Sequence, residues 1–203
     1  EMTDANSGNG TWSLWSGLND ATRNQEVTTG LLLSDVGLGG IGGVTNVNTL
    51  PSQMRKGVRT SFVTANQTYR FRVMASYASG LQDNGWAYAF SISTRQGGND
   101  YVKGVYYNAF GYFASVEKQF QSGRHRLALT LLGAPAERGA QQAAVQEVYD
   151  MVGNNYYNPN WGYQQGKMRN ARVRDNHEPV AMLNYTFNIT DRTKMDLATS
   201  FRF

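Results

Sequence analysis

Apolar and polar residues alternate along most of the chain from about residue 57 onward. In the segment 69–79, for example, Phe71 and Val73 fall on one face of an extended backbone and Arg70 and Arg72 fall on the other. The pattern predicts seven strands, at residues 58–64, 69–79, 86–95, 110–120, 125–132, 180–189 and 194–203. Most of them approach the roughly 9 to 11 residues that a tilted strand needs to cross a bilayer. Within the segment 110–120, Phe113 does not follow the alternation.

The connections between these segments fall into two sizes. Residues 82–85, 121–124 and 190–193 have the composition of tight hairpin turns. At the opposite edge lie one short link near Gln67 and two long ones, residues 97–108 and about 134–177. Short periplasmic turns and long extracellular loops are typical of outer-membrane barrels. The sequence therefore predicts an all-β fold, a transmembrane antiparallel β-barrel, with 134–177 as a long extracellular loop.

A soluble antiparallel sandwich also has alternating strands and is the main alternative for the fold. Its outward faces would be expected to carry mostly Lys, Glu and Asp. The polar faces predicted here instead carry Ala, Ser, Thr and Gly with isolated arginines. This composition favours strands that face lipid on one side and a lumen on the other.

The composition excludes several kinds of functional site. The 203 residues include no cysteine and only two histidines, His125 and His177, and the formal net charge is +4. Thiolate zinc sites and thiol nucleophiles are excluded, and little material is left for a histidine-based metal site or triad. No run of residues is long and apolar enough for a transmembrane helix. We expect no enzyme activity, no cofactor, no metal site and no nucleic-acid partner.

The glycine-rich stretch at 37–42 matches the pattern G-x-G-x-x-G of dinucleotide-binding loops. That motif must open a helix whose N-terminus meets the pyrophosphate. The residues that follow, 43–49, are β-branched and alternating and end before Pro51. We interpret the stretch as a bend that leads into a short strand.

The same region carries a resemblance to a known family. Residues 39–49, Gly-Gly-Ile-Gly-Gly-Val-Thr-Asn-Val-Asn-Thr, resemble the G-x-G-G-x-x-N-I-x-T stretch near the end of the plug domain of TonB-dependent outer-membrane receptors. Three later segments, 84–88, 101–104 and 157–163, are similar to a Bacteroidota branch of these receptors. The residues that match the plug motif are Gly39, Gly40, Gly42, Gly43 and Asn46.

This resemblance implies a specific organisation and activity. Receptors of this family have a barrel of about 22 strands closed by an N-terminal plug. Seven strands are too few, so we expect a piece of such a receptor, with the end of the plug at 1–54 and the first barrel strands at 55–203. The implied activity is active uptake of a nutrient, such as a glycan, peptide or siderophore, across the bacterial outer membrane. The implied partners are the TonB–ExbB–ExbD energising complex, outer-membrane lipids and, in some members, a surface lipoprotein.

Two groups of side chains are candidates for contact with a solute. The long loop combines aromatic rings with basic groups, at Tyr157, Trp161, Tyr163, Arg169 and Arg172. The predicted lumen face carries Arg59, Arg70, Arg72, Arg95 and Arg126. The alternative for the loop is that its rings pack against neighbouring segments and its bases meet lipopolysaccharide or solvent. The alternative for the lumen arginines is pairing with acids on the plug and adjoining strands.

A second function from a different class also fits part of the sequence. The last segment ends on an aromatic residue, Phe203, as outer-membrane barrels commonly do. A small structural or adhesive barrel without energised transport is therefore the alternative. It requires an eighth strand from residues 1–56, which do not resemble a membrane strand.

Overall fold

The computed structural model describes residues 21–22, 24–30, 43–98 and 100–203. Its strands are β1 (Asn24–Thr29), β2 (Gly43–Asn48), β3 (Gly57–Thr64), β4 (Phe71–Ala78), β5 (Trp86–Gln96), β6 (Tyr106–Phe120), β7 (His125–Gly133), β8 (Ala136–Gly139), β9 (Trp161–Gln164), β10 (Lys167–Asn170), β11 (Val173–Asn176), β12 (Val180–Thr190) and β13 (Thr193–Arg202). The 3₁₀ turns η2 (Pro51–Gln53) and η3 (Gln121–Gly123) and the helix α2 (Gln146–Val152) complete the elements named here. Among these residues, no helix has the length and apolar character needed to cross a membrane.

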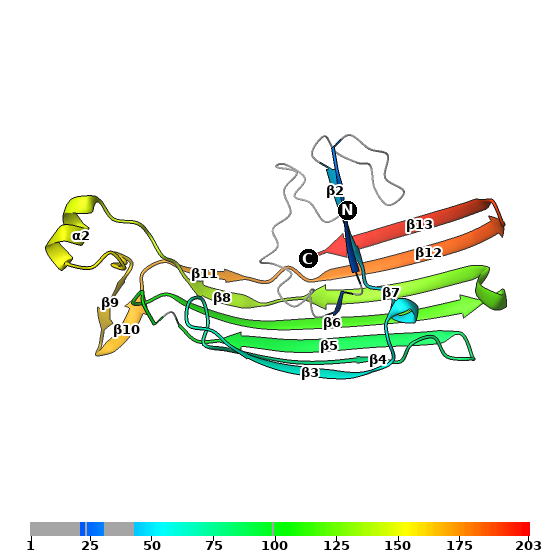
Figure 1. Ribbon diagram of the computed structural model, residues 1–203, viewed down its shortest axis with the longest axis horizontal. Helices are drawn as coiled ribbons and strands as arrows, with labels where there is room; N and C mark the ends of the chain where they lie inside the picture. Colours follow the sequence, from blue (N-terminus) through cyan, green and yellow to red (C-terminus); the bar gives the residue numbers. More distant parts are fainter. Residues whose placement is uncertain (1–20, 23, 31–42, 99) are drawn as a thin grey trace.

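The long strands form one antiparallel sheet of nine strands. Its main path runs β13-β12-β7-β6-β5-β4-β3, and β8 pairs with both β6 and β11. The long strands lie side by side along the length of the molecule, with the tight turns at one end and α2, β9 and β10 at the other (Figure 1). All seven predicted strands are present within a few residues of their predicted bounds. The all-β, antiparallel fold is therefore confirmed for the described residues.

The sheet is open within the described part of the chain. Its path ends at β3 on one side and at β13 on the other, so these two strands are its edges. β13 is exposed along its whole length. The described strands do not close on themselves, so a complete barrel is not present in them.

The tight turns follow from their sequences. Between β4 and β5, the Gly85 N–H donates to the carbonyl of Gln82 at 2.8 Å, and the Trp86 N–H donates to the Asn84 side chain at 3.1 Å. Gly85 has a φ of +78°, and a Cβ at this position would collide with the carbonyl oxygen of Gln119 on the neighbouring strand. Only glycine meets both demands.

The sheet extends beyond the predicted membrane segments at its loop end. β6 begins at Tyr106, four residues before the predicted start at 110, and the extra residues pair with β8. β7 and β8 are separated only by Ala134 and Pro135, where the Phe110 N–H donates to the Pro135 carbonyl at 3.0 Å. β11 leads into β12 in the same way. The first residues after 134 thus belong to the sheet and not to a loop.

The two faces of the sheet differ in what lies on them. On one, which we call the covered face, Phe113, Leu132, Val180, Ala78 and Ala89 form a buried cluster with Ala21; Val47, Met54 and Met182 pack against it. β1 and β2 stand over the middle of this face (Figure 1). The departure of Phe113 from the alternation is thereby explained, because its ring is the contact between the sheet and the N-terminal segment.

The other face, which we call the open face, carries large apolar side chains that nothing in the described structure covers. Its members on the seven long strands, all at least about one-third exposed, are Val58, Phe62, Phe71, Val73, Tyr77, Trp86, Phe90, Ile92, Phe110, Phe120, Leu127, Leu129, Leu131, Leu183, Ile189, Met195, Leu197 and Phe201. They are the residues that the alternation places outward. Phe62 at 67% and Leu197 at 64% are among the most exposed.

The short strand predicted after the glycine-rich stretch is present as β2, which pairs antiparallel with β1. Gly43 begins β2 with a φ of +114°, and a Cβ there would collide with the Thr28 carbonyl. Asn46 lies opposite Glu26. Gly39, Gly40 and Gly42 lie outside the described residues.

Candidate functional surfaces

The turn end of the open face combines aromatic rings with basic groups. Trp86 and Tyr88 stack with ring centroids 6.0 Å apart, and Lys118 Nζ lies 4.8 Å from the Trp86 ring and 5.6 Å from that of Phe120. On β7 the His125 ring stacks on Phe187 at 4.4 Å. Amphipathic rings and cations in one band are the side chains found where hydrocarbon meets lipid headgroups.

The covered face holds one fully buried carboxylate at the same end. Glu117 on β6 is 0% exposed. Its Oε2 accepts a hydrogen bond from the backbone N–H of Ser52 at 3.1 Å, and its Oε1 accepts one from the Gln119 side chain at 2.9 Å. Ser52 belongs to η2, the turn between the N-terminal strands and β3, and Pro51 beside it is buried. Glu117 therefore fastens this turn to the sheet. Its role could not be recognised from the sequence, because its partner is a distant backbone group.

The lumen arginines predicted from the sequence are found in different surroundings. Arg126 donates to the Thr186 hydroxyl at 3.2 Å, and Thr186 in turn donates to Asp196 at 2.7 Å. Arg70 precedes β4 and forms an ion pair with Asp100. These two side chains are engaged with a neighbouring strand and a loop.

The remaining three lumen arginines lie on strands with their side chains on the covered face. Arg72 and Arg95 are directly opposite each other in β4 and β5. Arg59 lies opposite Ser76, whose hydroxyl contacts the Arg59 carbonyl at 3.5 Å. The strands bring Arg72 and Arg95 together but keep Arg59 toward the turn end of the sheet.

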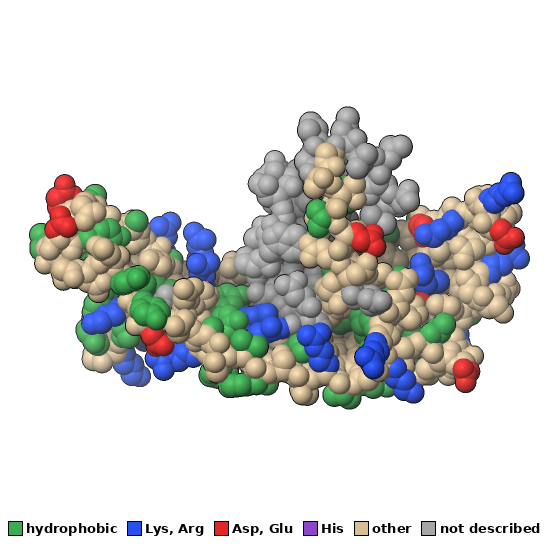
Figure 2. Space-filling view, viewed as in Figure 1, with side chains coloured by type: hydrophobic (Ala, Val, Ile, Leu, Met, Phe, Trp, Pro, Cys, Tyr) green, Lys and Arg blue, Asp and Glu red, His purple; other side chains and the backbone are tan. Residues whose placement is uncertain are grey.

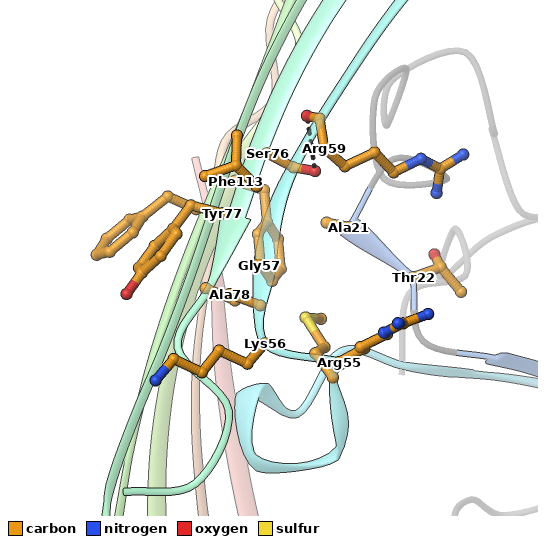
Figure 3. Close-up of a pocket in the computed structure, with 14 residues that line it drawn as sticks. Ala21, Thr22, Arg55, Lys56, Gly57, Arg59, Ser76, Tyr77, Ala78 and Phe113 are labelled. Atoms are coloured by element: carbon orange, nitrogen blue, oxygen red, sulfur yellow. Dashed lines mark hydrogen bonds between the residues drawn. The ribbon is translucent and has the colours of Figure 1, made fainter.

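Arg59 borders a groove of about 540 Å³ between Ala21 and Thr22 on one side and the beginning of β3 on the other. Phe113 and Ala78 point toward Ala21 on one side of the sheet, whereas Tyr77 points to the other side (Figure 3). Arg55 and Arg59 extend along the N-terminal segment beside Ala21 and Thr22 (Figure 3). The groove therefore separates the beginning of β3 from the segment that packs on the covered face.

The long loop is a folded unit organised by asparagine side chains. Asn158 is 0% exposed. Its Nδ2 donates to the carbonyls of Lys103 and Ala140, both at 3.2 Å, and its Oδ1 accepts from the N–H groups of Gln142 and Asn160 at 3.3 and 3.2 Å. Asn170 adds donations to the carbonyls of Gly104 and Ala140. These bonds join the 134–177 loop to the shorter loop after β5, and sequence analysis missed their role.

Of the aromatic candidates in the loop, some are packed against other side chains and one is largely exposed. Trp161 is half-buried under Lys103, whose Nζ lies 4.9 Å from the ring, and Tyr163 meets it edge-on at 5.8 Å. Tyr163 is 71% exposed, and Tyr157 is partly buried. Arg169 and Arg172 are exposed, on β10 and just before β11. The loop thus exposes the Tyr163 ring and the guanidinium groups of Arg169 and Arg172. Trp161 packs against Tyr163 and Lys103.

In the residues that the structure describes, no three His, Asp or Glu side chains are grouped so that they could hold a metal ion. Comparison of the chain with known protein families, curated proteins and solved structures finds no match.

Proposed function

We propose that this chain forms part of the wall of an outer-membrane β-barrel, with its N-terminal residues as the end of a plug, and that it acts in TonB-dependent uptake of a nutrient. The observation that carries the proposal is the contrast between the two faces of one sheet. The open face is apolar along all seven long strands, whereas the covered face holds small and polar side chains and receives the N-terminal segment.

The open face supports a lipid environment. Monomeric soluble proteins rarely expose a contiguous apolar surface of more than a few hundred Å². Here the exposed side chains continue from β3 across to β13 without interruption by charged residues in the middle of the strands. The ring-and-cation band near Trp86 and Lys118 supports a membrane interface at the turn end.

The contacts of the N-terminal segment support a plug-like role for residues 1–54. Val47 on β2 packs against the cluster around Phe113, and η2 is held by Glu117. A segment that fills the lumen side of a barrel wall must make this kind of contact with inward side chains. In the proposed mechanism, TonB pulls on residues that precede this segment and opens a path along the covered face.

The long loop supports solute capture on the outer side. It lies at the end of the sheet opposite the tight turns, is rigidified by Asn158 and Asn170, and presents Tyr163, Arg169 and Arg172 outward. We propose that these residues take part in holding a glycan, peptide or siderophore, together with a surface lipoprotein if one is present.

The proposal is tested in the bacterium that encodes the chain. Inner and outer membranes are separated by density, and strains lacking this gene or tonB are grown on panels of glycans, peptides and iron chelates. We expect the protein in the outer membrane and a growth defect on one nutrient class that the tonB deletion shares. Recovery in the soluble fraction, or uptake that continues without TonB, contradicts the proposal. Outer-membrane localisation without any nutrient defect favours the structural or adhesive barrel.

A further inference from the structure

The ribbon formed by β8 and β11 has two pairs of like charges directly opposite each other. Arg138 lies opposite Arg174, and Glu137 lies opposite Asp175. Because neighbouring residues of a strand point to opposite faces, the two arginines share one face and the two acids share the other. Like charges that face each other across a pair of strands are destabilising unless something between them compensates.

The register of the sheet assigns the arginine pair to the covered face. Arg95 on β5 lies opposite Ala109 on β6, and Ala109 lies opposite Ala136 on β8. Residue 138 follows two positions later and has the same orientation as Ala136. Basic side chains rise over β8 and β11 on the side of the molecule where β1 and β2 stand (Figure 2).

The acids of the ribbon do not neutralise this pair, because they act on the opposite face. Burial and a side-chain hydrogen bond to Glu137 raise the pKa of Tyr106 to about 12, and Asp175 acts on the same phenol. The Glu137 carboxylate therefore lies by Tyr106 on the open side of the ribbon, where Arg169 also acts on the phenol.

The arginine pair differs from four other arginines of the covered face. Arg126 and Arg202 have hydrogen-bonded partners at Thr186 and Glu178, and Arg72 and Arg95 are engaged in interactions of their own. Within the part of the chain that the structure describes, the Arg138 and Arg174 side chains have no hydrogen bond or ion pair, and both are exposed. The register thus places two arginine side chains directly opposite each other, with donors that no described residue uses.

We propose that Arg138 and Arg174 form a subsite for an oxyanion, a carboxylate, phosphate or sulfate group, on the solute that enters along the covered face. This inference rests on the proposed uptake function and narrows its substrate to molecules that carry such a group. One oxyanion between the two planar forks accepts hydrogen bonds from both and removes the repulsion between them. The pair lies between the folded loop and the middle of the sheet, so a solute meets it after the loop and before the N-terminal segment.

The test is a calorimetric titration of the detergent-purified protein with citrate and with inorganic phosphate. We expect wild-type protein to bind citrate, and R138Q and R174Q each to bind it about tenfold more weakly. R138K keeps the charge but not the planar guanidinium group, so its affinity for citrate should lie between those of wild type and R138Q. R192Q is the matched control, because Arg192 is an exposed arginine in the β12–β13 turn at the other end of the sheet, and its affinity should stay at the wild-type value.

Thermal melting shows whether each variant is folded. Citrate should raise the melting temperature of wild type and R192Q but not that of R138Q or R174Q, and all four should melt within a few degrees without it. Absence of citrate and phosphate binding in wild type, or equal affinity in all variants, overturns the subsite. The titration needs neither a membrane nor TonB, so its failure is distinct from a failure of the uptake proposal.

Discussion

At the scale of single residues, the covered face depends on side chains whose partners are far away in the sequence. Glu117 contacts Ser52, 65 residues earlier, and Phe113 contacts Ala21. Both occupy inward positions on β6, where the inward residues on either side of Phe113, Gly111 and Ser115, are small. A carboxylate and a ring in such a row identify the place where another segment is attached.

Removal of the Glu117 carboxylate should loosen the η2 turn. Glu117→Ala leaves the partly buried Ser52 N–H without an acceptor, at a cost of up to about 1–3 kcal/mol. Glu117→Gln keeps an acceptor of the same shape and should cost less. The measurement is the rate of protease cleavage in residues 50–57 of the folded protein, together with unfolding in urea from lipid vesicles.

Two substitutions of Ser52, the donor of this hydrogen bond, test the same prediction from the other side. Ser52→Pro removes the N–H and the hydroxyl and also disfavours helical backbone angles at Pro51, so it should loosen the turn at least as much as Glu117→Ala. Ser52→Ala keeps the N–H and should leave cleavage unchanged. Equal cleavage in Glu117→Ala and wild type would contradict the role of Glu117 as a fastening.

At the scale of elements, the tight turns and the long loop are stabilised in different ways. The β4–β5 turn depends on local groups, with Gly85 and the Asn84 side chain within four residues. The long loop depends on Asn158, whose partners at Lys103 and Ala140 lie 55 and 18 residues away. The loop should therefore open as a unit when this residue is changed.

Asn158→Ala should unfold the loop locally and leave the sheet intact. The substitution removes the side-chain partner of the Lys103 carbonyl and of the Gln142 and Asn160 N–H groups, at about 1–3 kcal/mol for each donor that finds no water, whereas the Ala140 carbonyl keeps its bond from Asn170. Hydrogen exchange should accelerate by at least about tenfold in residues 140–142 and 158–163, with little change in β4 and β5.

Asn154→Ala is the control for that experiment. Asn154 accepts one local hydrogen bond from the Tyr156 N–H at 2.8 Å and is exposed. The hydrogen-exchange pattern of Asn154→Ala should match that of wild type. Acceleration throughout the sheet in Asn158→Ala would indicate that the loop and the sheet are one cooperative unit.

At the scale of the whole molecule, the sheet has a direction as well as two faces. The tight turns lie at one end and the folded loop at the other (Figure 1). If the sheet spans the outer membrane as proposed, the two ends lie in different compartments. The exposed residues Asp83 and Gln164 mark the two ends.

Cysteine labelling can measure this orientation because the chain has no native cysteine. An impermeant thiol reagent added to intact cells should label Gln164→Cys and should not label Asp83→Cys. Both should be labelled after the outer membrane is permeabilised, which controls for access to each thiol. Labelling of Asp83→Cys with protection of Gln164→Cys would invert the topology and place the 134–177 loop in the periplasm.

The strands and tight turns could be predicted from the sequence because their signals are local. Alternation has a period of two residues, so Val73 and Phe90 indicate their strands without knowledge of any neighbour. The turn at Gly85 is likewise determined by residues next to it. The predicted strand ends are less accurate near Tyr106 and Arg138, because Tyr106-Tyr107 and Glu137-Arg138 place similar residues in succession and do not alternate.

The candidate site was predictable only in part. The loop residues Trp161 and Tyr163 were found from composition, and the structure brings their rings together. Asn158 and Arg138 were not selected, because an asparagine or arginine in a loop has no distinctive local pattern. Arg126 and Arg70 were selected as ligand candidates, but their engagement with Thr186 and Asp100 depends on strand register and loop position.

By itself, then, the sequence determined the antiparallel β class, seven strands, their turns and the side of each strand that is apolar. Tertiary structure decided which inward residues are covered, that Glu117 is joined to η2, and that Arg138 and Arg174 stand opposite each other. The physical reason is the range of the interactions. Backbone geometry and side-chain alternation act between neighbours, whereas burial, hydrogen bonds to a distant backbone and the pairing of like charges arise only when separate strands are brought into register.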